Sequence, residues 1–259
     1  MMTNVETWYN IKESDIDEFE KIDKLYLLKL FEAPRSTPSV ALFLELGILP
    51  LSVTVKVRQL CYLHNILKSQ KQGMLYKVFI TQWLQPTTGD WVLQVKSDLK
   101  EFEIKCDFEW IASKSKEAFK KLVNGKAKEY ALNKLNNKKL THSKLEKLEY
   151  FELSTQCYLL SENLSVEDKK NVFSFRTRMA KYGENFKSGR PFTMCPLCQL
   201  HFDSQYLALE CPAIRKQIAA EDITDLQDIY STNVSAKSAK LLGQITRIRE
   251  NILKGTLSM

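Results

Sequence analysis

The residues with the clearest potential for chemistry form a short cysteine-rich segment near the C-terminus. Cys195 and Cys198 are separated by two residues, a spacing that lets both thiolates bind one metal ion from a tight turn, and Cys211 follows after twelve more residues. A tetrahedral zinc site needs four ligands, and His201 is the only histidine nearby. Thiolates and imidazole are ligands that zinc prefers. The sequence therefore predicts a zinc site made of Cys195, Cys198, His201 and Cys211.

Two alternatives stay open for this segment. Only Gln199 and Leu200 separate Cys198 from His201, which leaves little chain for both side chains to reach one ion, so Asp203 or water is an alternative fourth ligand. The other alternative is a loop with three free thiols and no metal. If an ion does bind, we expect it to contribute to folding, because the ligands close a loop that is too short for a core of its own.

A second candidate is the lysine-rich stretch 112–147, which holds eleven lysines and three glutamates, a net charge of +8, whereas the whole chain carries +7. An apolar stripe through Phe119, Val123 and Ala127 predicts a helix ringed by lysines. Such lysines can neutralise the phosphates of a nucleic acid, and the alternative is a solvated helix face. The candidate phosphate contacts, here and in two later basic segments, are Lys114, Lys116, Lys120, Lys121, Lys126, Lys128, Lys134, Lys138, Lys139, Arg176, Arg178, Lys187 and Arg190.

Motifs of the common enzyme classes are absent from the chain. It has no glycine-rich phosphate loop, no His-Glu-x-x-His and no Gly-x-Ser-x-Gly. Acidic pairs such as Glu167-Asp168 fit helix starts better than metal-dependent catalysis. We therefore expect no enzyme activity. The remaining cysteines, Cys61, Cys106 and Cys157, are expected to be buried structural thiols in a reducing compartment.

The elements that position these residues are predicted to be helices. Glycine and proline are scarce, at 8 and 7 residues, and 44% of the chain is hydrophobic, as in a soluble globular protein. Nearly every apolar period is helical, so we expect an all-α fold of eight to ten helices, an irregular array with a small cysteine-rich, zinc-knuckle-like loop near the C-terminus. Among these helices we expect one near 14–32, one ending at Gly47, one capped by Asp90, one over 144–160, and one opened by a capping box at Ser165.

Composition and charge divide the chain into four expected segments. These are an acidic N-terminal helical segment (1–35), a helical region with its basic centre (36–182), the cysteine loop (183–215) and the C-terminal helices (216–259). No apolar run is long enough to span a membrane, and the N-terminus lacks the order of a signal peptide. We therefore expect a nuclear or cytoplasmic protein without a membrane partner.

Several stretches, taken in order, resemble a known family. They are Leu42–Pro50, Tyr62–His64 with Met74–Lys77, Gln82-Trp83 with Gly89–Trp91, Lys126–Leu132, and Phe175–Ala180 running on to Cys195–Cys198. Together they resemble the C-terminal part of the reverse-transcriptase polyprotein of non-LTR (LINE-type, jockey-like) retrotransposons, the part that follows the polymerase palm. The resemblance covers roughly residues 30–255.

The resemblance implies a helical appendage that holds template RNA or target DNA and ends in a zinc-knuckle-like motif. RNA or DNA, and the rest of a retrotransposon polyprotein, would be its partners. The Tyr-x-Asp-Asp motif and the endonuclease are missing, so the chain resembles a non-catalytic fragment of an RNA-directed DNA polymerase. Members of that family usually carry a histidine about where Tyr206 and Leu207 stand, so the three cysteines carry over and that histidine does not. The alternative is a helical protein-interaction or structural domain with a solvated basic face and a degenerate metal site.

Overall fold

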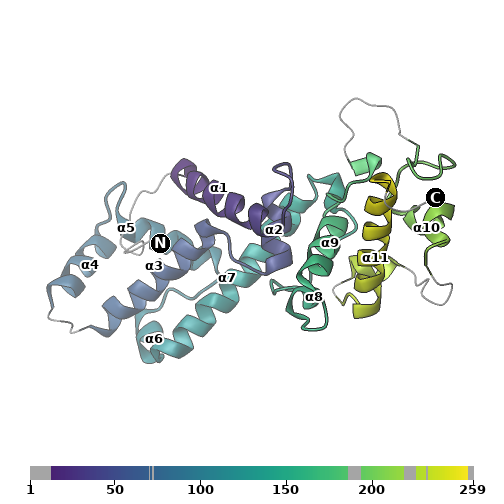
Figure 1. The fold of residues 1–259 in the computed structure, drawn as a ribbon. Helices are drawn as coiled ribbons and strands as arrows, with labels where there is room; N and C mark the ends of the chain where they lie inside the picture. The colour runs from purple at the N-terminus through teal and green to yellow at the C-terminus, as the bar shows by residue number, and fades with distance from the viewer. Residues whose placement is uncertain are drawn as a thin grey trace. The chain divides into compact units, whose positions relative to one another are not determined.

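The computed structural model describes residues 13–69, 71, 73–185, 194–218, 226–231 and 233–255. Within these ranges the chain forms eleven α-helices and short 3-10 turns, with one isolated β-bridge and no strand (Figure 1). The prediction of an all-α fold with a cysteine-rich loop is confirmed. The helices exceed the expected eight to ten, and some are single turns, such as α8 (Cys157–Leu160), which forms within a segment that was expected to be one longer helix, and α10 (Pro212–Arg215).

The chain divides into two compact units, each built from two separate stretches. Unit 1 comprises residues up to 24 together with 48–135, and unit 2 comprises 25–47 together with 136–259. This division differs from the four expected segments. The physical reason lies in unit 2, where buried side chains from before, within and after the cysteine loop share one hydrophobic core.

Unit 1 is built on α3 (Leu51–Lys68), which packs against α4 (Met74–Leu84), α5 (Trp91–Glu101) and α6 (Phe108–Ser113). Leu60 and Leu63 on α3 are completely buried. His64 is also buried, its ring stacked on Phe119 and its Nε2 3.1 Å from the carbonyl oxygen of Lys114. This histidine therefore has a packing role.

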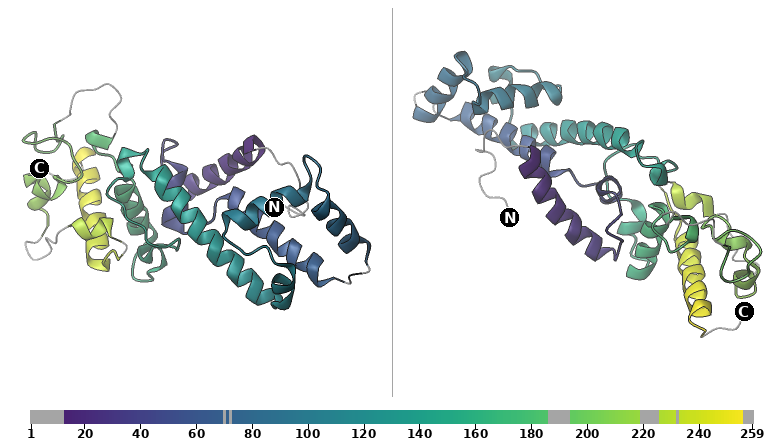
Figure 2. Two further views of the ribbon diagram at one scale, coloured as in Figure 1. Left: turned by 180° about the vertical axis from the view of Figure 1, so that it is seen from behind. Right: turned by 90° about the horizontal axis from the view of Figure 1, so that it is seen from above.

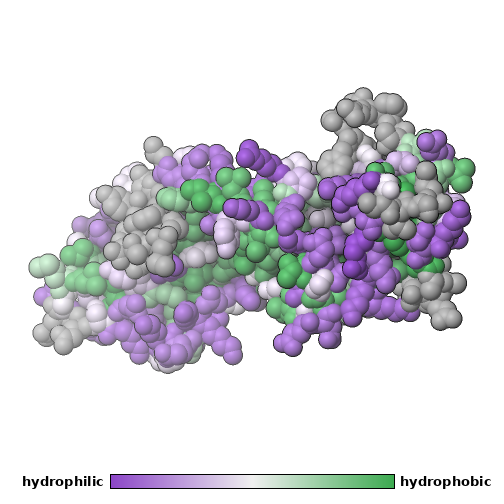
Figure 3. All heavy atoms as spheres, viewed as in Figure 1, coloured by the Kyte–Doolittle hydropathy of each residue, from purple (hydrophilic) through white to green (hydrophobic). Residues whose placement is uncertain are grey.

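The lysine-rich stretch forms α7 (Lys116–Lys139), the longest helix of the described chain. Every fourth residue from Phe119 to Leu135 is buried, which is the spacing of one helix face. Gly125 does not interrupt the helix, although a glycine there weakens it relative to alanine. Hydrophilic side chains cover the surface over α6 and α7 (Figure 3). The sequence therefore forms a helix with one buried apolar face and with lysines on its remaining surface.

Unit 2 is built around α9 (Val166–Arg176) and α11 (Ala236–Leu253), which lie side by side (Figure 2). Val172 and Phe173 on α9 and Leu242 and Ile245 on α11 are buried in the core. The predicted capping box opens α9: Ser165 Oγ accepts from the backbone N–H of Asp168, and the Asp168 carboxylate accepts from Ser165. The end of α1 (Glu13–Leu30) and α2 (Ser39–Leu46) complete the unit.

A buried ion pair lies at the centre of unit 2. Arg176 Nε donates to Glu45 Oε1 over 2.8 Å, and both side chains are completely buried. Tyr150 and Tyr158 donate their hydroxyls to the same carboxylate. The Arg176 guanidinium also donates to the carbonyl oxygens of Ile229 and Ser231. Because each charge has a partner and most donors are used, the pair fixes α2 and α9 in one arrangement.

The expected helix over 144–160 is wrong. The structure has a 3-10 turn at 143–145, then non-helical chain up to α8. Two hydrogen bonds tie this stretch to other elements: Tyr150 O accepts from Asn136 Nδ2 over 3.3 Å, and Gln156 N donates to Glu45 O over 3.0 Å. A backbone group that bonds to another element is not available for a helix of its own stretch.

Among the described residues, no single helix is long and apolar enough to cross a membrane. One consecutive pair, α2 with α3, meets that test only when the two helices are taken together.

Candidate metal centre

The cysteine loop begins as a tight reversal of the chain. Met194 and Phe202 form an antiparallel bridge, and the N–H of Cys195 donates to the carbonyl oxygen of His201 over 2.7 Å. The N–H of Gln199 donates back to Cys195 over 2.9 Å, and Gln199 adopts a left-handed backbone with φ 55°. This turn places the Cys195 and Cys198 thiols close together, as a CxxC metal site requires.

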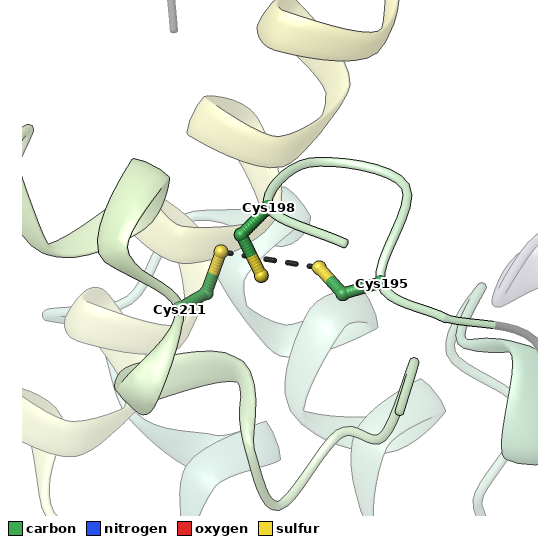
Figure 4. Close-up of side chains that lie close together, drawn as sticks. All are labelled: Cys195, Cys198 and Cys211. Atoms are coloured by element: carbon green, nitrogen blue, oxygen red, sulfur yellow. Dashed lines mark hydrogen bonds between the residues drawn. The ribbon is translucent and has the colours of Figure 1, made fainter. Parts of the chain in front are cut away.

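Cys211 enters the site from the other side, directly before α10. Pro212 occupies the first helical position, where its missing N–H is not needed. The Sγ atoms of Cys195 and Cys211 lie 3.9 Å apart, and all three cysteine Sγ atoms lie within 4.8 Å of one another (Figure 4). Tetrahedral zinc with bonds of about 2.3 Å requires thiolates separated by about 3.8 Å. The three cysteines therefore have the spacing of a metal site.

The loop is anchored in the core of unit 2. Cys195 and Cys211 are 3% and 0% exposed, and Leu197 and Ile214 beside them belong to the same core as α9 and α11. We expected a loop too short for a core of its own. The loop is short, but its buried residues belong to the core of unit 2. None of the six cysteines forms a disulfide.

The surroundings of two thiols shift their pKa values in opposite directions. Burial raises the pKa of Cys211 to about 11, although the N–H groups of Ile214 and Ala213 act against it. For Cys198, burial also acts to raise the pKa, but the backbone N–H of Leu200, the neighbouring thiols and the N–H of His201 outweigh it and lower the pKa. Backbone N–H groups thus point at two of the three sulfurs, which suits bound thiolates.

His201 lies beside the three cysteines, but its ring nitrogens do not belong to the group of mutually close ligand atoms. Its Nε2 is 3.7 Å from Cys198 Sγ, close to the roughly 3.6 Å that a shared tetrahedral zinc requires. The cluster in which every ligand atom lies within 4.8 Å of the others contains the three cysteines without His201. His201 Nδ1 is 3.3 Å from the carbonyl oxygen of Phe202, and a proton there leaves Nε2 as the metal-binding nitrogen.

The alternative fourth ligand, Asp203, is engaged elsewhere. Its carboxylate pairs with Arg249 at 2.8 Å and accepts from the N–H of Gly183 over 2.7 Å. Tyr206, near the position where the resemblance led us to look for a histidine, stacks on Tyr230. Among the described residues His201 is therefore the side chain best placed to join the three cysteines.

The predicted phosphate contacts of α7 differ in how accessible they are. Four of the lysines have partners: Lys114 lies over the Trp110 ring, Lys134 lies 6.0 Å from the centroid of the Tyr130 ring, Lys126 pairs with Glu129 at 2.9 Å, and Lys139 donates to the carbonyl oxygen of Leu148. Lys134 is nevertheless exposed, as are Lys116, Lys120, Lys121, Lys128 and Lys138.

Neither arginine proposed as a phosphate contact is fully exposed, and the last two basic candidates lie outside the described residues. Arg176 is completely buried against Glu45, so its prediction as a phosphate contact was wrong and its role is structural. Arg178 is partly buried, with its Nη2 3.5 Å from Glu184. Lys187 and Arg190 lie outside the described residues.

Some expectations about individual residues were wrong, and some residues were missed. Of the three isolated cysteines, Cys106 is exposed, and Cys61 and Cys157 are partly buried. Lys147 and Tyr206, which lie in contact in unit 2, were not selected from the sequence. Lys147 was counted within the basic stretch, but nothing local connects it to a tyrosine 59 positions away.

No family model, no curated protein and no solved structure matches this chain. The case for its function therefore rests on the arrangement of its own residues.

Proposed function

We propose that this chain is a non-catalytic module that binds RNA or DNA through the lysines of α7 and carries a structural zinc ion in its cysteine loop. The observation that carries the proposal is the set of exposed lysines around a helix whose apolar stripe is buried. Ammonium groups on a fixed helix can each neutralise a phosphate and release a counterion. Because lysine contacts phosphate and not base edges, little base selectivity is expected.

The proposed zinc ion supports the fold and performs no reaction. Cys195, Cys198 and Cys211 would supply three thiolates and His201 the fourth ligand, a closed set that leaves no position for a substrate. Two of the thiols are buried in the core of unit 2, so a bound ion would hold the loop to that core. The resemblance to the C-terminal part of non-LTR retrotransposon reverse transcriptases fits such a module, which there would hold template RNA or target DNA.

The experiment reverses three exposed lysines of α7 that form no ion pair with the other described residues, in the variant Lys120→Glu/Lys121→Glu/Lys128→Glu. Affinity for labelled single-stranded and duplex oligonucleotides is measured by fluorescence anisotropy across a range of salt concentrations. We expect affinity at low salt to fall at least about 30-fold, and the salt dependence to flatten by about two to three contacts.

The matched control reverses three exposed lysines of unit 1 on other helices, Lys68, Lys77 and Lys100. It makes the same change in net charge, so we expect a much smaller loss of affinity. Equal losses in the two variants would mean that total charge, and not α7, governs binding, and the proposal would be abandoned.

One observation favours a protein-interaction function as the second candidate. Helix α4 exposes several apolar side chains, with Met74 81% and Leu84 73% exposed. If the α7 variant binds nucleic acid as the unchanged protein does, and α4 substitutions such as Met74→Ser and Leu84→Ser abolish self-association in sedimentation velocity, this second function becomes the better one.

A further inference from the structure

A group of cations gathers around one aromatic ring on unit 2. The ammonium of Lys147 lies 3.9 Å from the centroid of the Tyr206 ring, and the guanidinium carbon of Arg178 lies 5.7 Å from the same centroid. Tyr206 stacks on Tyr230 with centroids 5.9 Å apart. Lys144 is close enough to Arg178 for the two charges to repel. We call Lys144, Lys147, Arg178 and Tyr206 the tyrosine–cation cluster.

Three of the four side chains of the cluster are cationic. The Nη2 of Arg178 lies 3.5 Å from the carboxylate of Glu184, and the ammonium of Lys144 donates to the carbonyl oxygen of Asn185. Glu184 also accepts a hydrogen bond from the N–H of Gln205 over 2.7 Å, so its charge is shared. Burial, followed by the charge of Arg178, lowers the pKa of Lys144, as expected where like charges converge. An anion placed among these side chains would relieve that repulsion.

Arg178 has two further features that point to a ligand. Its backbone is left-handed, with φ 54°, a conformation that costs a non-glycine residue energy and that clusters at functional sites. Its Nε is buried and has no hydrogen-bond partner among the described residues. The Arg178 side chain is 23% exposed, so part of its charged group can reach a bound phosphate.

The cysteine loop holds Tyr206 in place. Gln205, which precedes it, is completely buried; its amide nitrogen donates to Phe175 O over 3.1 Å and to the hydroxyl of Tyr230, and its amide oxygen accepts from Asn185. Tyr206 also lies between Cys198 and Cys211 in the chain, so a metal ion at those cysteines would close the loop that carries it. The ring around which the cations gather thus has a fixed position.

We infer that the tyrosine–cation cluster binds a phosphate group of a nucleic-acid strand. Arg178, Lys147 and Lys144 supply the positive charge, and the Tyr206 ring contacts both Lys147 and Arg178. The inference rests on the proposed function and adds to it a contact that does not involve α7.

The test uses the full, zinc-loaded chain and a labelled single-stranded oligonucleotide in fluorescence anisotropy, with inorganic phosphate and a phosphoserine peptide of equal charge as further probes. Lys147→Glu is compared with Lys240→Glu, which makes the same charge change on the exposed side of α11. Tyr206→Leu is compared with Tyr206→Phe, which keeps the ring. Circular dichroism and zinc content establish that each variant is folded.

We expect Lys147→Glu and Tyr206→Leu to weaken strand binding about tenfold, and Lys240→Glu and Tyr206→Phe to change it less than about threefold. Equal effects of Lys147→Glu and Lys240→Glu would overturn the inference; if the α7 variant still weakens binding, the proposed function survives without it. Loss of inorganic phosphate binding with unchanged strand binding would identify a free-phosphate site and equally overturn it. Tighter binding of the phosphoserine peptide than of the strand would assign the cluster to a different class of partner.

Discussion

At the scale of single residues, His201 would decide whether a metal ion at the three cysteines has a fourth protein ligand. Its Nε2 has the right distance from Cys198 Sγ for a shared ion, yet it lies outside the group in which the three sulfurs meet. The imidazole is partly buried, and a bound ion would favour a rotamer that brings Nε2 towards the three thiolates, because its fourth ligand would otherwise be water.

The first prediction concerns this ligand. Cys198→Ser should lose the ion, whereas His201→Ala should keep a bound ion with about tenfold or greater loss of affinity, because water replaces the imidazole. Cobalt titration measures this, since the visible bands report the number of thiolates and the tetrahedral geometry. His142→Ala, at a histidine distant in the chain, is the control. An unchanged spectrum and affinity in His201→Ala would remove His201 from the ligand set.

The second prediction concerns the tyrosines that share the Glu45 carboxylate. Burial and then the Glu45 charge raise the pKa of Tyr150 and Tyr158 well above the usual value of 10.0. Both therefore remain protonated in the folded chain while the unfolded chain ionises near pH 10, so their contribution is fully present below pH 10 and is lost as pH rises above it. Urea unfolding from pH 8 to pH 11.5 should show falling stability.

Two substitutions check that result. Tyr150→Phe should flatten the loss of stability above pH 10, while lowering stability at pH 7 by about 1–2 kcal/mol because one hydrogen bond to buried Glu45 is missing. Tyr26→Phe, at a tyrosine that is 70% exposed, should change neither. A pH profile of Tyr150→Phe that matches the unchanged protein would show that these hydroxyls do not govern alkaline stability.

Residues whose role depends on near neighbours were predictable from the sequence, and those with distant partners were not. The approach of the three thiols follows from a CxxC turn and one short return of the chain. The burial of Arg176 depends on Glu45, which lies 131 positions earlier in the chain. In the sequence, Arg176 lies close to Arg178 and Lys181, and an exposed basic helix face has the same pattern.

At the scale of elements, caps and stops were predictable where local chemistry alone sets them. The capping box at Ser165 forms as expected. Asp90 precedes α5 as expected, but its carboxylate accepts from Thr87 N over 2.6 Å, so it stabilises the preceding turn and does not cap the helix. The stretch 146–156 has helical periodicity but follows its tertiary hydrogen bonds. Local pattern therefore failed where distant backbone groups offered better partners.

The third prediction concerns Gly47, which ends α2 with φ 63°. A Cβ there would lie 2.1 Å from the backbone carbon of Ser154, so the neighbouring chain would have to move. We expect Gly47→Ala to destabilise unit 2 by about 3 kcal/mol or more, since a backbone clash adds to left-handed strain. Thermal unfolding followed by circular dichroism measures the change.

Substitutions at two other glycines distinguish the cost of a left-handed backbone from the cost of a steric clash. Gly89 has φ 91° with open space around its Cβ position, so Gly89→Ala should cost only about 1 kcal/mol. Gly125 has open space and lies inside α7, so Gly125→Ala should stabilise the helix by about 0.5–1 kcal/mol. A Gly47→Ala protein as stable as Gly89→Ala would show that the chain at Ser154 yields easily.

At the scale of the whole molecule, the division into two units could not be read from composition. The charge pattern suggested boundaries at 35, 182 and 215, but each unit joins an early stretch of the chain to a late one. In unit 2, Leu28 and Leu42 from the early stretch share a core with Cys195, Cys211 and Ile245. Contacts over such separations leave no local signal in a single sequence.

The fourth prediction follows from where the metal ligands lie. All three cysteines belong to unit 2, and Cys195 and Cys211 are part of its core, so removing a bound ion would take away the link between the CxxC turn and Cys211. We expect a chelator to speed amide hydrogen exchange in 194–215 and in α9 and α11, which pack against the loop's core residues.

Exchange in α3, α5 and α6 of unit 1 should stay unchanged, and these helices serve as the internal control. Cys198→Ser without chelator should reproduce the same pattern, which separates loss of the ion from other effects of the chelator. Faster exchange of equal size in both units would contradict a structural role confined to unit 2, and no change in either would mean that the thiols hold no ion that matters to the fold.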